Sequence, residues 1–332
     1  MTLAKTANIK QLITFQKVAR LGNVSLAAEE LFLSQSATSI QLSNLEDAVG
    51  TKLLNRTGRG IRLTEAGEVL YTLSERVLNV WQEVSDEMES YLGDFTGTLR
   101  IGAVTTAEYW LPHVLVNFAN ANPKVKLKLQ VANRDEVVRY LAANEIDLAV
   151  MGRAPQEVKV KSTSFANNPT AFLAAPSHVL MHTPGLNLEM LANSQMLVRE
   201  KGSGARASLE RIFKVAGLKL AMGAELSSNE SIKQLCIAGL GPAYLSLQSC
   251  LLEIRAGLLS VLPLANNPMN RRWHVVHLEN KPLSQVATVF MEHLIRHGQA
   301  EIERQLELMS KIPLDGMAAL HSKPEEPDAL LP

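Results

Sequence analysis

Two arginines flank a glycine-containing loop in the segment LVREKGSGARASLERIF, residues 197–213. Arg199 ends an apolar run, a Gly-Ser-Gly follows at 202–204, and Arg206 lies at the start of a helical pattern. Backbone N–H groups at a helix start, together with nearby cations, commonly hold a phosphate or a carboxylate. The segment therefore predicts an anion-binding loop, which could serve either catalysis or detection of a ligand.

The residues that catalysis needs do not assemble in this chain. KGSGARAS (201–208) lacks the Lys-Ser/Thr pair of a phosphate-binding P-loop, and no serine stands in a GxSxG context. HLIRH (293–297) spaces two histidines for zinc, but Glu292 precedes the first histidine, whereas a metalloprotease needs a glutamate after it. His274 and His277, three apart on a predicted strand, point to opposite faces. We therefore expect neither an enzyme nor a metal site.

Several more polar residues follow predicted strands or open predicted helices. The candidate effector-binding residues are Thr105, Thr106, Asn133, Arg134, Gly152, Arg153, Gly202, Ser203, Gly204, Arg206 and Asn229. Open α/β sheets bind ligands at the carboxyl ends of their strands. Each residue alone is equally typical of a helix cap, but several arginines at one edge favour an anion site. Arg153 and Arg206 are the leading candidates, because a guanidinium can hold a phosphate with two hydrogen bonds.

From residue 98 onwards the pattern alternates between strands and helices. Strands are expected at 98–104, 125–131, 146–151, 170–175, 195–199, 220–226, 242–247 and 271–277, and helices at 108–120, 134–144, 187–193, 204–216, 229–238 and 284–310. This alternation is typical of parallel sheets, and its length suits two small lobes better than one. We expect one lobe from 98–166 and 268–310, a second from 167–267, and a disordered Pro-containing tail at 311–332.

Short helical segments make up the first 63 residues. Helices are predicted at 8–21, 25–32 and about 35–48, and the last two are joined by a short turn, as in a helix-turn-helix. LLNRTGRGIRLT (53–64) follows and predicts a hairpin wing against a nucleic-acid backbone. Residues 1–63 hold eight Lys or Arg against four Asp or Glu, which suits a polyanionic partner. The alternative is a three-helix protein-binding module.

The third predicted helix has an outer face of hydroxyls and amides rather than Glu and Lys. Such groups hydrogen-bond to phosphates and base edges. The inner face is expected to hold Ala37, Ile40, Leu45 and Val49. The candidate DNA-binding residues, including the arginines of the wing, are Ser34, Gln35, Ser36, Thr38, Ser39, Gln41, Asn44, Arg56, Arg59 and Arg62.

A long helix is predicted from Thr64 to Leu92, with Thr64 as its N-cap and Glu65 and Glu68 in its first turn. Apolar residues recur at the 3-4-3-4 spacing of a coiled coil. They are Leu70, Leu73, Val77, Val80, Val84 and Met88. A solitary acidic helix has nothing on its own chain to bury this stripe, so residues 64–93 are predicted to be a dimerisation helix.

Composition restricts the cellular setting. Cys236 and Cys250 stand outside any CxxC motif and are expected to be buried apolar residues in a reducing compartment. No run of about 18 apolar residues could form a membrane span, and the first residues do not resemble a signal peptide. We expect a cytoplasmic protein with no membrane partner.

The segment AAEELFLSQSATSIQLSNLEDAVGTKLLNRTGRGIRLTEAG (27–67) resembles the winged helix-turn-helix of LysR-type bacterial transcription regulators. The chain departs from the family pattern at Ser36, where proline is usual, and at Leu54-Asn55, where Phe-x is common. In the second half, MGRAP (151–155), REKGSGARASLERIF (199–213), SSNESIKQLCIAGLG (227–241) and RRWHVVH (271–277) resemble one subgroup, the regulators of RuBisCO (Calvin-cycle) operons.

The resemblance implies an all-α winged helix-turn-helix head, a long coiled-coil linker helix and a two-lobed α/β effector domain like that of periplasmic binding proteins. It implies a homotetrameric dimer of dimers on promoter DNA, an activator of carbon-fixation genes acting on RNA polymerase. The implied effector is a phosphorylated sugar, a phosphoglycerate-type acid or NADPH, with no resident cofactor. The alternative is a LysR-type regulator of another metabolic operon with a carboxylate or amino-acid effector.

Overall fold

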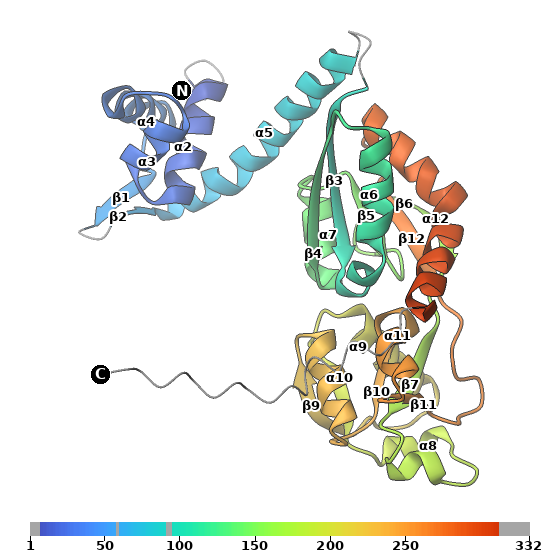
Figure 1. Cartoon of the computed structure of the whole chain (residues 1–332). Coiled ribbons are helices and arrows are strands. Elements are labelled where there is room, and N and C mark those ends of the chain that lie inside the picture. Colours follow the sequence, from blue (N-terminus) through green and yellow to red (C-terminus); the bar gives the residue numbers. More distant parts are fainter. Residues whose placement is uncertain (1–6, 58–59, 91–94, 312–332) are drawn as a thin grey trace, which may run out of the picture.

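The computed structural model describes residues 7–57, 60–90 and 95–311 (Figure 1). A helical head is joined by one long helix to two α/β lobes that lie one beyond the other. The expected tail lies outside the described residues from 312 onwards. Within the described ranges, no helix combines the length and apolar character that crossing a membrane requires.

In the described part of the head, three helices and a hairpin pack around a small core. These elements are α2 (Ile9–Leu21), α3 (Val24–Glu30), α4 (Gln35–Val49), β1 (Leu54–Thr57) and β2 (Gly60–Leu63). Phe15, Leu45 and Leu53 are fully buried at its centre. Asn8 and Gln11 form a capping box at the start of α2, and Gly22 ends that helix in the left-handed conformation, φ 63°.

One helix start in the head differs from the prediction. α3 begins at Val24 rather than Ser25, because the side chain of Asn23 accepts hydrogen bonds from the backbone N–H groups of Ser25 and Leu26. Asparagine is as good an N-cap as serine, and it comes two residues earlier in the chain.

Helix α5 (Glu65–Ser90) leaves the head as a single rod. The hydroxyl of Thr64 accepts a hydrogen bond from the backbone N–H of Gly67, 3.0 Å away, and so caps the first turn as expected. Gly67 lies so close to the chain before β1 that a Cβ there would come within 2.1 Å of the carbonyl oxygen of Leu53. The absence of a side chain at Gly67 lets α5 pack directly on the head.

Lobe 1 is built on a five-stranded sheet. Its strands lie in the order β4 (Val125–Ala132), β3 (Gly97–Val104), β5 (Leu148–Met151), β12 (Arg272–Leu278) and β6 (Val160–Asn167). Its helical elements are η1 (Thr105–Tyr109), α6 (Leu111–Ala121), α7 (Arg134–Ala142) and α12 (Gln285–Lys311). Trp110 and Trp273 meet edge to face in the core, with ring centroids 5.3 Å apart.

Lobe 2 has a second five-stranded sheet. Its strands lie in the order β11 (Ser260–Val261), β7 (Thr170–Ala174), β10 (Ala243–Ser246), β8 (Met196–Arg199) and β9 (Met222–Leu226). Its helical elements are η2 (Val179–His182), α8 (Leu188–Ala192), α9 (Gly204–Val215), α10 (Asn229–Ile237), η3 (Leu247–Ser249) and α11 (Leu251–Arg255). Cys236 and Cys250 are buried here, and burial raises the pKa of each thiol to about 12.

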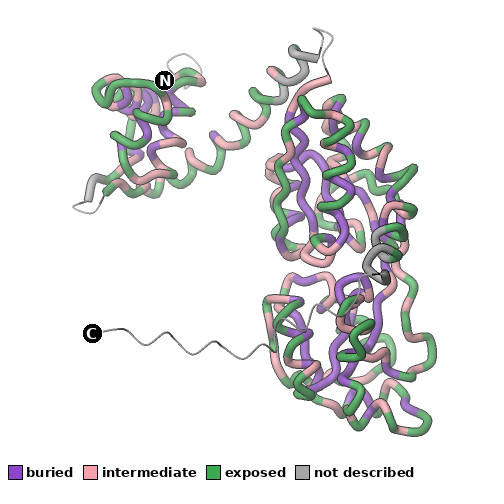
Figure 2. Tube along the Cα trace, in the orientation of Figure 1, coloured by how far each residue is buried: buried purple, intermediate pink, exposed green. Residues whose placement is uncertain are grey.

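Both sheets are mixed, which corrects the expectation of parallel sheets. β12 runs antiparallel to β5 and β6, and β7 runs antiparallel to β10 and β11. β6 was not expected at all, because its first half is polar and exposed, as suits a strand at the sheet edge. Figure 2 shows burial concentrated inside each lobe rather than shared between them.

The chain crosses between the lobes twice, and the two crossings lie side by side. The backbone N–H of Asn168 donates to the carbonyl of Arg271 at 2.8 Å, and Thr170 and Met269 form a reciprocal backbone pair. Two adjacent crossings form a hinge that fixes one edge of the cleft between the lobes.

Candidate functional site

The exposed face of α4 carries the first candidate site, and its position differs by part of a turn from the prediction. Gln35, Ser36 and Asn44 are exposed, Ser39 is half-buried, and Ser34 caps the helix by accepting from the backbone N–H of Ala37. On the hairpin, Arg62 is exposed. In helix-turn-helix proteins, the second helix of the motif and the wing are the parts that contact DNA. Contact of these side chains with DNA stays a prediction.

Two predicted DNA-binding residues face the head core instead. Thr38 is fully buried and donates to the carbonyl of Ser34 at 3.1 Å, so the prediction that it faces outwards is wrong. Gln41 is turned inwards, where its side-chain oxygen accepts a hydrogen bond from the hydroxyl of Thr14. The buried residues of α4 are Thr38, Leu42, Leu45 and Ala48.

That same rotation exposes Ile40, which was predicted to be buried, and Ser43, which was not predicted to be exposed. The apolar residues Leu42 and Leu45, with Ala48 one turn on, already give the helical spacing of a buried stripe. Ile40 does not fit that stripe, and this spacing was the signal that could have placed it on the exposed face.

The hairpin is held against α2 by its backbone. The N–H of Ile61 donates to the carbonyl of Gly22 at 2.9 Å, at the residue that ends α2. This contact fixes the strand that carries Arg62. Arg59 and the side chain of Arg56 lie outside the described residues, so their predicted contacts with DNA stay predictions.

Helix α5 presents an exposed apolar stripe. It consists of Val69, Leu73, Val77, Val80, Trp81, Val84 and Met88, each about half exposed. Leu70 differs from the prediction: it is partly buried and packs against the core of the head. Val69 and Trp81 were not predicted. The remaining five predicted residues lie on a face that the described part of the chain leaves uncovered.

A cavity of about 890 Å³ lies between the two lobes. The predicted residues that line it are Thr105, Thr106, Asn133, Arg134, Gly152, Arg153, Ser203 and Gly204. Gly202, Arg206 and Asn229 do not line it. Other polar residues line the cavity although they were not predicted to bind an effector, among them Arg199, Ser208, Arg211 and Arg271.

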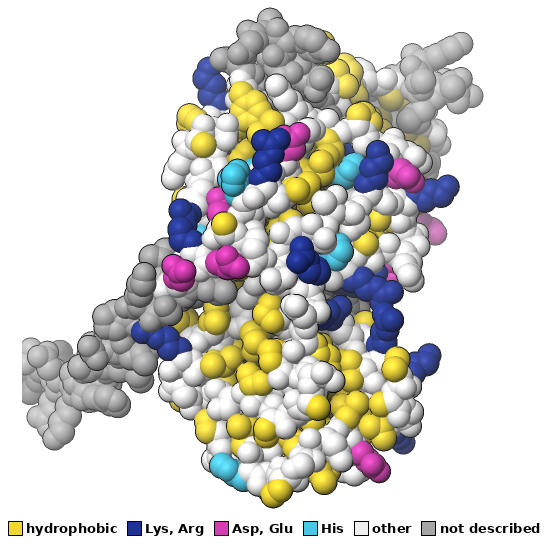
Figure 3. Space-filling model, turned by 90° about the vertical axis from the view of Figure 1, so that its right-hand side faces the viewer, with side chains coloured by type: hydrophobic (Ala, Val, Ile, Leu, Met, Phe, Trp, Pro, Cys, Tyr) yellow, Lys and Arg dark blue, Asp and Glu magenta, His cyan; other side chains and the backbone are white. Residues whose placement is uncertain are grey.

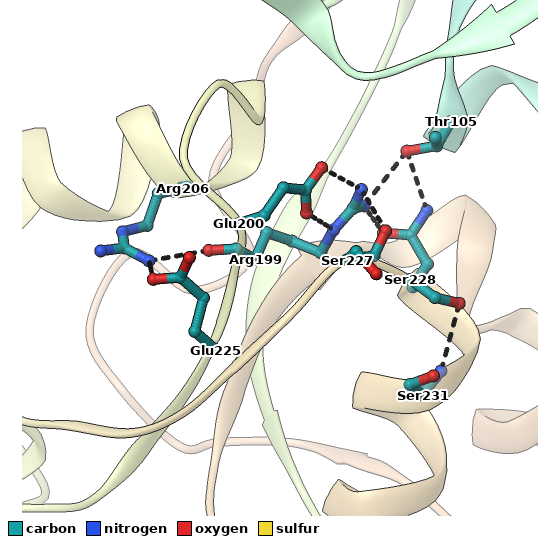
Figure 4. Close-up of polar contacts among 9 residues, drawn as sticks. Thr105, Arg199, Glu200, Arg206, Glu225, Ser227, Ser228 and Ser231 are labelled. Carbon is teal, nitrogen blue, oxygen red and sulfur yellow. Dashed lines mark hydrogen bonds and ion pairs between the residues drawn. The ribbon is translucent and has the colours of Figure 1, made fainter.

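Arg206 is committed to its own lobe, which corrects its assignment as a leading phosphate ligand. Its side chain is 5% exposed and forms ion pairs with Glu210 at 2.5 Å and with Glu225 at 3.0 Å. It also donates to the carbonyl of Arg199 at 2.8 Å (Figure 4). A buried guanidinium with two carboxylates and a carbonyl around it has little left to offer a ligand.

Arg199 ties lobe 2 to lobe 1. Its guanidinium donates to the hydroxyl of Thr105 in lobe 1 at 3.1 Å, to the side-chain oxygen of Asn229, and to Glu200 at 2.7 Å. Figure 4 shows this fan of contacts reaching from β8 across to Thr105. Asn229 and Thr105 are therefore placed by Arg199. We call this group, Arg199 with Thr105 and Asn229, the interlobe latch.

Arg134 is also paired with carboxylates, at the rim of the cavity. It forms ion pairs with Glu157 at 3.1 Å and with Asp135 at 3.1 Å. Hydrogen bonding to Arg134 lowers the pKa of Glu157 to about 2. The backbone N–H of Asp135 donates to the carbonyl of Gly202 at 3.2 Å, so this rim is a second place where the lobes touch.

Three other arginines line the cavity without a carboxylate partner among the described residues. Arg153 and Arg211 are exposed, and half-buried Arg271 donates only to the hydroxyl of Ser208. Figure 3 shows Lys and Arg side chains gathered where the two lobes meet. We call Arg153, Arg211 and Arg271 the cavity arginines.

The N-terminus of helix α9 contributes backbone N–H groups to the cavity wall. Ser203 is its N-cap but makes no side-chain capping bond, and Gly204 and Ala205 line the cavity beside it. Helix N–H groups without a capping side chain attract an anion. No group of His, Cys, Asp and Glu in the described ranges has the arrangement of a metal site.

Comparisons with known proteins agree on a family. A model described as "Bacterial regulatory helix-turn-helix protein, lysR family" matches residues 9–68, and one described as "LysR substrate binding domain" matches residues 93–299. The second match alone spans more than half of the chain. The chain belongs to the LysR family. It is thus a DNA-binding transcription regulator with an effector-binding domain, and not an enzyme.

Relatives of this LysR-family chain are known at moderate identity. It is 35% identical over 296 residues to the HTH-type transcriptional activator CmpR of Synechocystis sp.. This match covers 89% of this chain and 97% of CmpR. It is 35% identical over 288 residues to a RuBisCO operon transcriptional regulator of Allochromatium vinosum, with coverage of 87% and 95%.

Two solved structures place the LysR-family fold. The regulatory domain of CcmR from Synechocystis PCC6803, in complex with 2-PG, matches with a TM-score of 0.57 and 30% identity over 60% of this chain and 96% of that one. Full-length CbnR complexed with its target DNA matches with a TM-score of 0.66 over 87% of this chain and 99% of that one. Its identity of 22% shows the shared fold alone.

Proposed function

We propose that this LysR-family regulator activates carbon-fixation genes when a small phosphorylated anion occupies the cavity between its lobes. The observation that carries the proposal is the set of cavity arginines, which line one pocket with no carboxylate partner among the described residues. The relatives named as RuBisCO operon regulators supply the class of target genes.

The charge of the cavity favours a phosphate over a neutral ligand. Arg153, Arg211 and Arg271 can each donate two parallel hydrogen bonds, and the start of α9 offers backbone N–H groups. The related CcmR domain is described in complex with 2-PG, which makes 2-PG the first ligand to test. A phosphorylated sugar, phosphoglycerate and NADPH belong to the same class and complete the panel.

The DNA-binding unit is a dimer joined through the stripe on α5. A half-exposed stripe of valine, leucine and tryptophan along an otherwise polar helix is the face that a second copy would cover. Two heads joined in this way contact two half-sites on one duplex, with α4 of each in a major groove. Pairs of dimers then form a tetramer, and the protein acts in the cytoplasm, where its DNA is.

An effector acts by changing how the lobes sit against each other. The crossings at 168–169 and 270–271 form the hinge, and the interlobe latch joins the lobes through Arg199 and Thr105. An anion bound by cavity arginines from both lobes favours the closed arrangement over any open one. The change alters the separation of the heads, hence the bend of the promoter and its contact with RNA polymerase.

The proposal is tested by two binding experiments on the full chain. The first measures the melting temperature with 2-PG, the other phosphorylated ligands, unphosphorylated carboxylates and amino acids, because a ligand of the native state raises it. A rise with phosphorylated ligands alone is expected. A rise only with carboxylates or amino acids would instead favour a regulator of another operon.

The second experiment measures binding to a promoter fragment of carbon-fixation genes and to random duplex of equal length. We expect preference for the promoter and a steep loss of affinity with salt. Replacing exposed Gln35 by alanine should weaken promoter binding more than random binding. Equal binding to both duplexes by the unmodified chain would contradict the proposal.

A further inference from the structure

Ile40 stands out on the DNA-facing side of α4. It is 59% exposed, and its neighbours along the same face, Ser36, Ser43 and Asn44, are exposed polar residues. Ser36 comes four residues before Ile40, and Ser43 and Asn44 come three and four residues after it, so all three adjoin Ile40 on one helix face. Of these four residues, Ile40 alone has an apolar side chain.

Packing inside the head does not account for this isoleucine. Leu42, Leu45 and Ala48 are buried on α4, and Ile40 is absent from the core cluster to which Leu42 and Leu45 belong. Single exposed apolar residues are common on protein surfaces, so exposure alone carries no argument. The position of Ile40 carries the argument instead: it lies in the middle of the face of α4 that is proposed to meet the major groove, among polar side chains that can hydrogen-bond to bases.

We propose that Ile40 is a specificity-determining residue that contacts the C5-methyl group of thymine in the major groove. This inference rests on the DNA-binding function proposed above. Thymine differs from the other bases in that groove by its methyl group, which makes apolar contacts. The hydroxyls of Ser36 and Ser43 and the amide of Asn44 select donors and acceptors, whereas Ile40 supplies the apolar surface that a methyl group requires.

The test removes only the methyl group. A duplex is selected from a random pool by the full-length protein, and each thymine in turn is replaced by uracil, which keeps every hydrogen-bonding group. Affinity is measured by fluorescence anisotropy at one salt concentration. Uracil at one or two positions in each half-site should weaken binding of the unmodified protein about 3- to 5-fold, the effect of losing about one buried methyl contact.

A variant assigns those positions to Ile40. Ile40→Ala should bind the thymine duplex as weakly as the unmodified protein binds the uracil duplex, with no further loss when uracil is introduced. Val179→Ala is the matched control, because Val179 is 72% exposed and belongs to η2 of lobe 2, outside the DNA-binding head. It should keep the full sensitivity to uracil.

A second variant changes the preference rather than removing it. Ile40→Gln places an amide that can form two hydrogen bonds with adenine, so repeated selection should move the preferred base at those positions from thymine towards adenine. A structural role for Ile40 would not move base preference.

The outcomes separate this inference from the function it rests on. If the unmodified protein binds its selected duplex but tolerates uracil at every position, or if Ile40→Ala stays sensitive to uracil, the inference is wrong while DNA binding stands. If selection enriches no duplex, the proposed function fails instead. The uracil scan uses unmodified protein, so it does not depend on the folding of any variant.

Discussion

Two sets of arginines lie in or near the cleft between the lobes, and they differ in what surrounds them. Arg199 and Arg206, at either end of the glycine-containing loop, are buried and bonded to carboxylates and carbonyls of the protein. The cavity arginines Arg153, Arg211 and Arg271 have no carboxylate partner in the described part of the chain. A glycine loop beside arginines is therefore insufficient evidence of a ligand site.

Burial explains the difference. A guanidinium taken out of water must be compensated by nearby carboxylates, since the desolvation cost is several kcal/mol. The charge of Arg206 is compensated by Glu210 and Glu225. The charge of Arg199 is compensated by Glu200 and by hydrogen bonds to Thr105 and Asn229. The cavity arginines are exposed or half-buried, so they stay in contact with water until an anion replaces it. Arg199 and Arg206 therefore stabilise the structure of the lobes, whereas the cavity arginines are free to bind an anion.

The largest expected effect falls on a cavity arginine. Arg271→Gln should weaken 2-PG binding about 10- to 100-fold, because a charge-assisted contact contributes about 1.5–3 kcal/mol. Isothermal titration calorimetry measures the change. Arg272→Gln is the matched control, because Arg272 is exposed, bonds to Asn167 and does not line the cavity. Equal losses in both variants would show that the cavity arginines are not special.

A smaller effect, on stability rather than binding, is expected at Arg206. Arg206→Ala should lower the free energy of unfolding by about 2 kcal/mol, less than for a fully buried pair, because Glu210 and Glu225 are half exposed and regain water. Urea unfolding followed by circular dichroism measures it. Arg211→Ala, on the same helix but exposed, should cost under about 0.5 kcal/mol. A large loss of 2-PG affinity in folded Arg206→Ala protein would reverse the comparison.

The interlobe latch should show an intermediate effect on motion. Arg199→Lys keeps the charge, but one ammonium cannot reach Thr105, Asn229 and Glu200 in their present places. We expect a loss of about 1 kcal/mol and faster amide hydrogen exchange in η1, at residues 105–109. Unchanged exchange there would mean that the latch does not hold the lobes together.

The smallest effect concerns the ion pair of Arg134 and Glu157. The pKa of Glu157 is lowered from 4.5 to about 2, so the pair stabilises the folded chain above pH 4.5 and loses this contribution as pH falls towards 2. Because Glu157 is 58% exposed, the contribution stays under about 1 kcal/mol. An NMR titration should show the pKa of Glu157 returning towards 4.5 in Arg134→Gln. The same titration curve in both proteins would exclude the pair as the cause.

The sequence predicted the architecture more completely than it predicted the details of the site. Helical spacing and capping residues such as Thr64 predicted the long α5, and alternation of strands and helices predicted two lobes. Strand direction was not predictable, because apolar alternation is the same for parallel and antiparallel neighbours. β6 was missed because an edge strand needs no apolar pattern.

The errors in the site have two physical sources. On α4, short residues such as Ser39 and Thr38 fit either a buried or an exposed face. The predicted helix therefore differed from the observed one in its rotation about the axis, with Ile40 on the buried side. In the cleft, the partner Glu210 four residues after Arg206 was visible in the sequence, but Glu225 comes from the next strand. Arg271 reaches the cavity only because the chain returns there at its second crossing.

The central claim is that an anion in the cavity changes the DNA-bound state of the regulator. It is tested most directly by measuring the bend of a promoter fragment, through energy transfer between its labelled ends, while 2-PG is added to the bound protein. We predict a saturable change in bend, shifted at least tenfold to higher 2-PG concentration by Arg271→Gln and left in place by Arg272→Gln. An unchanged bend at a concentration where calorimetry shows the cavity filled would contradict the account.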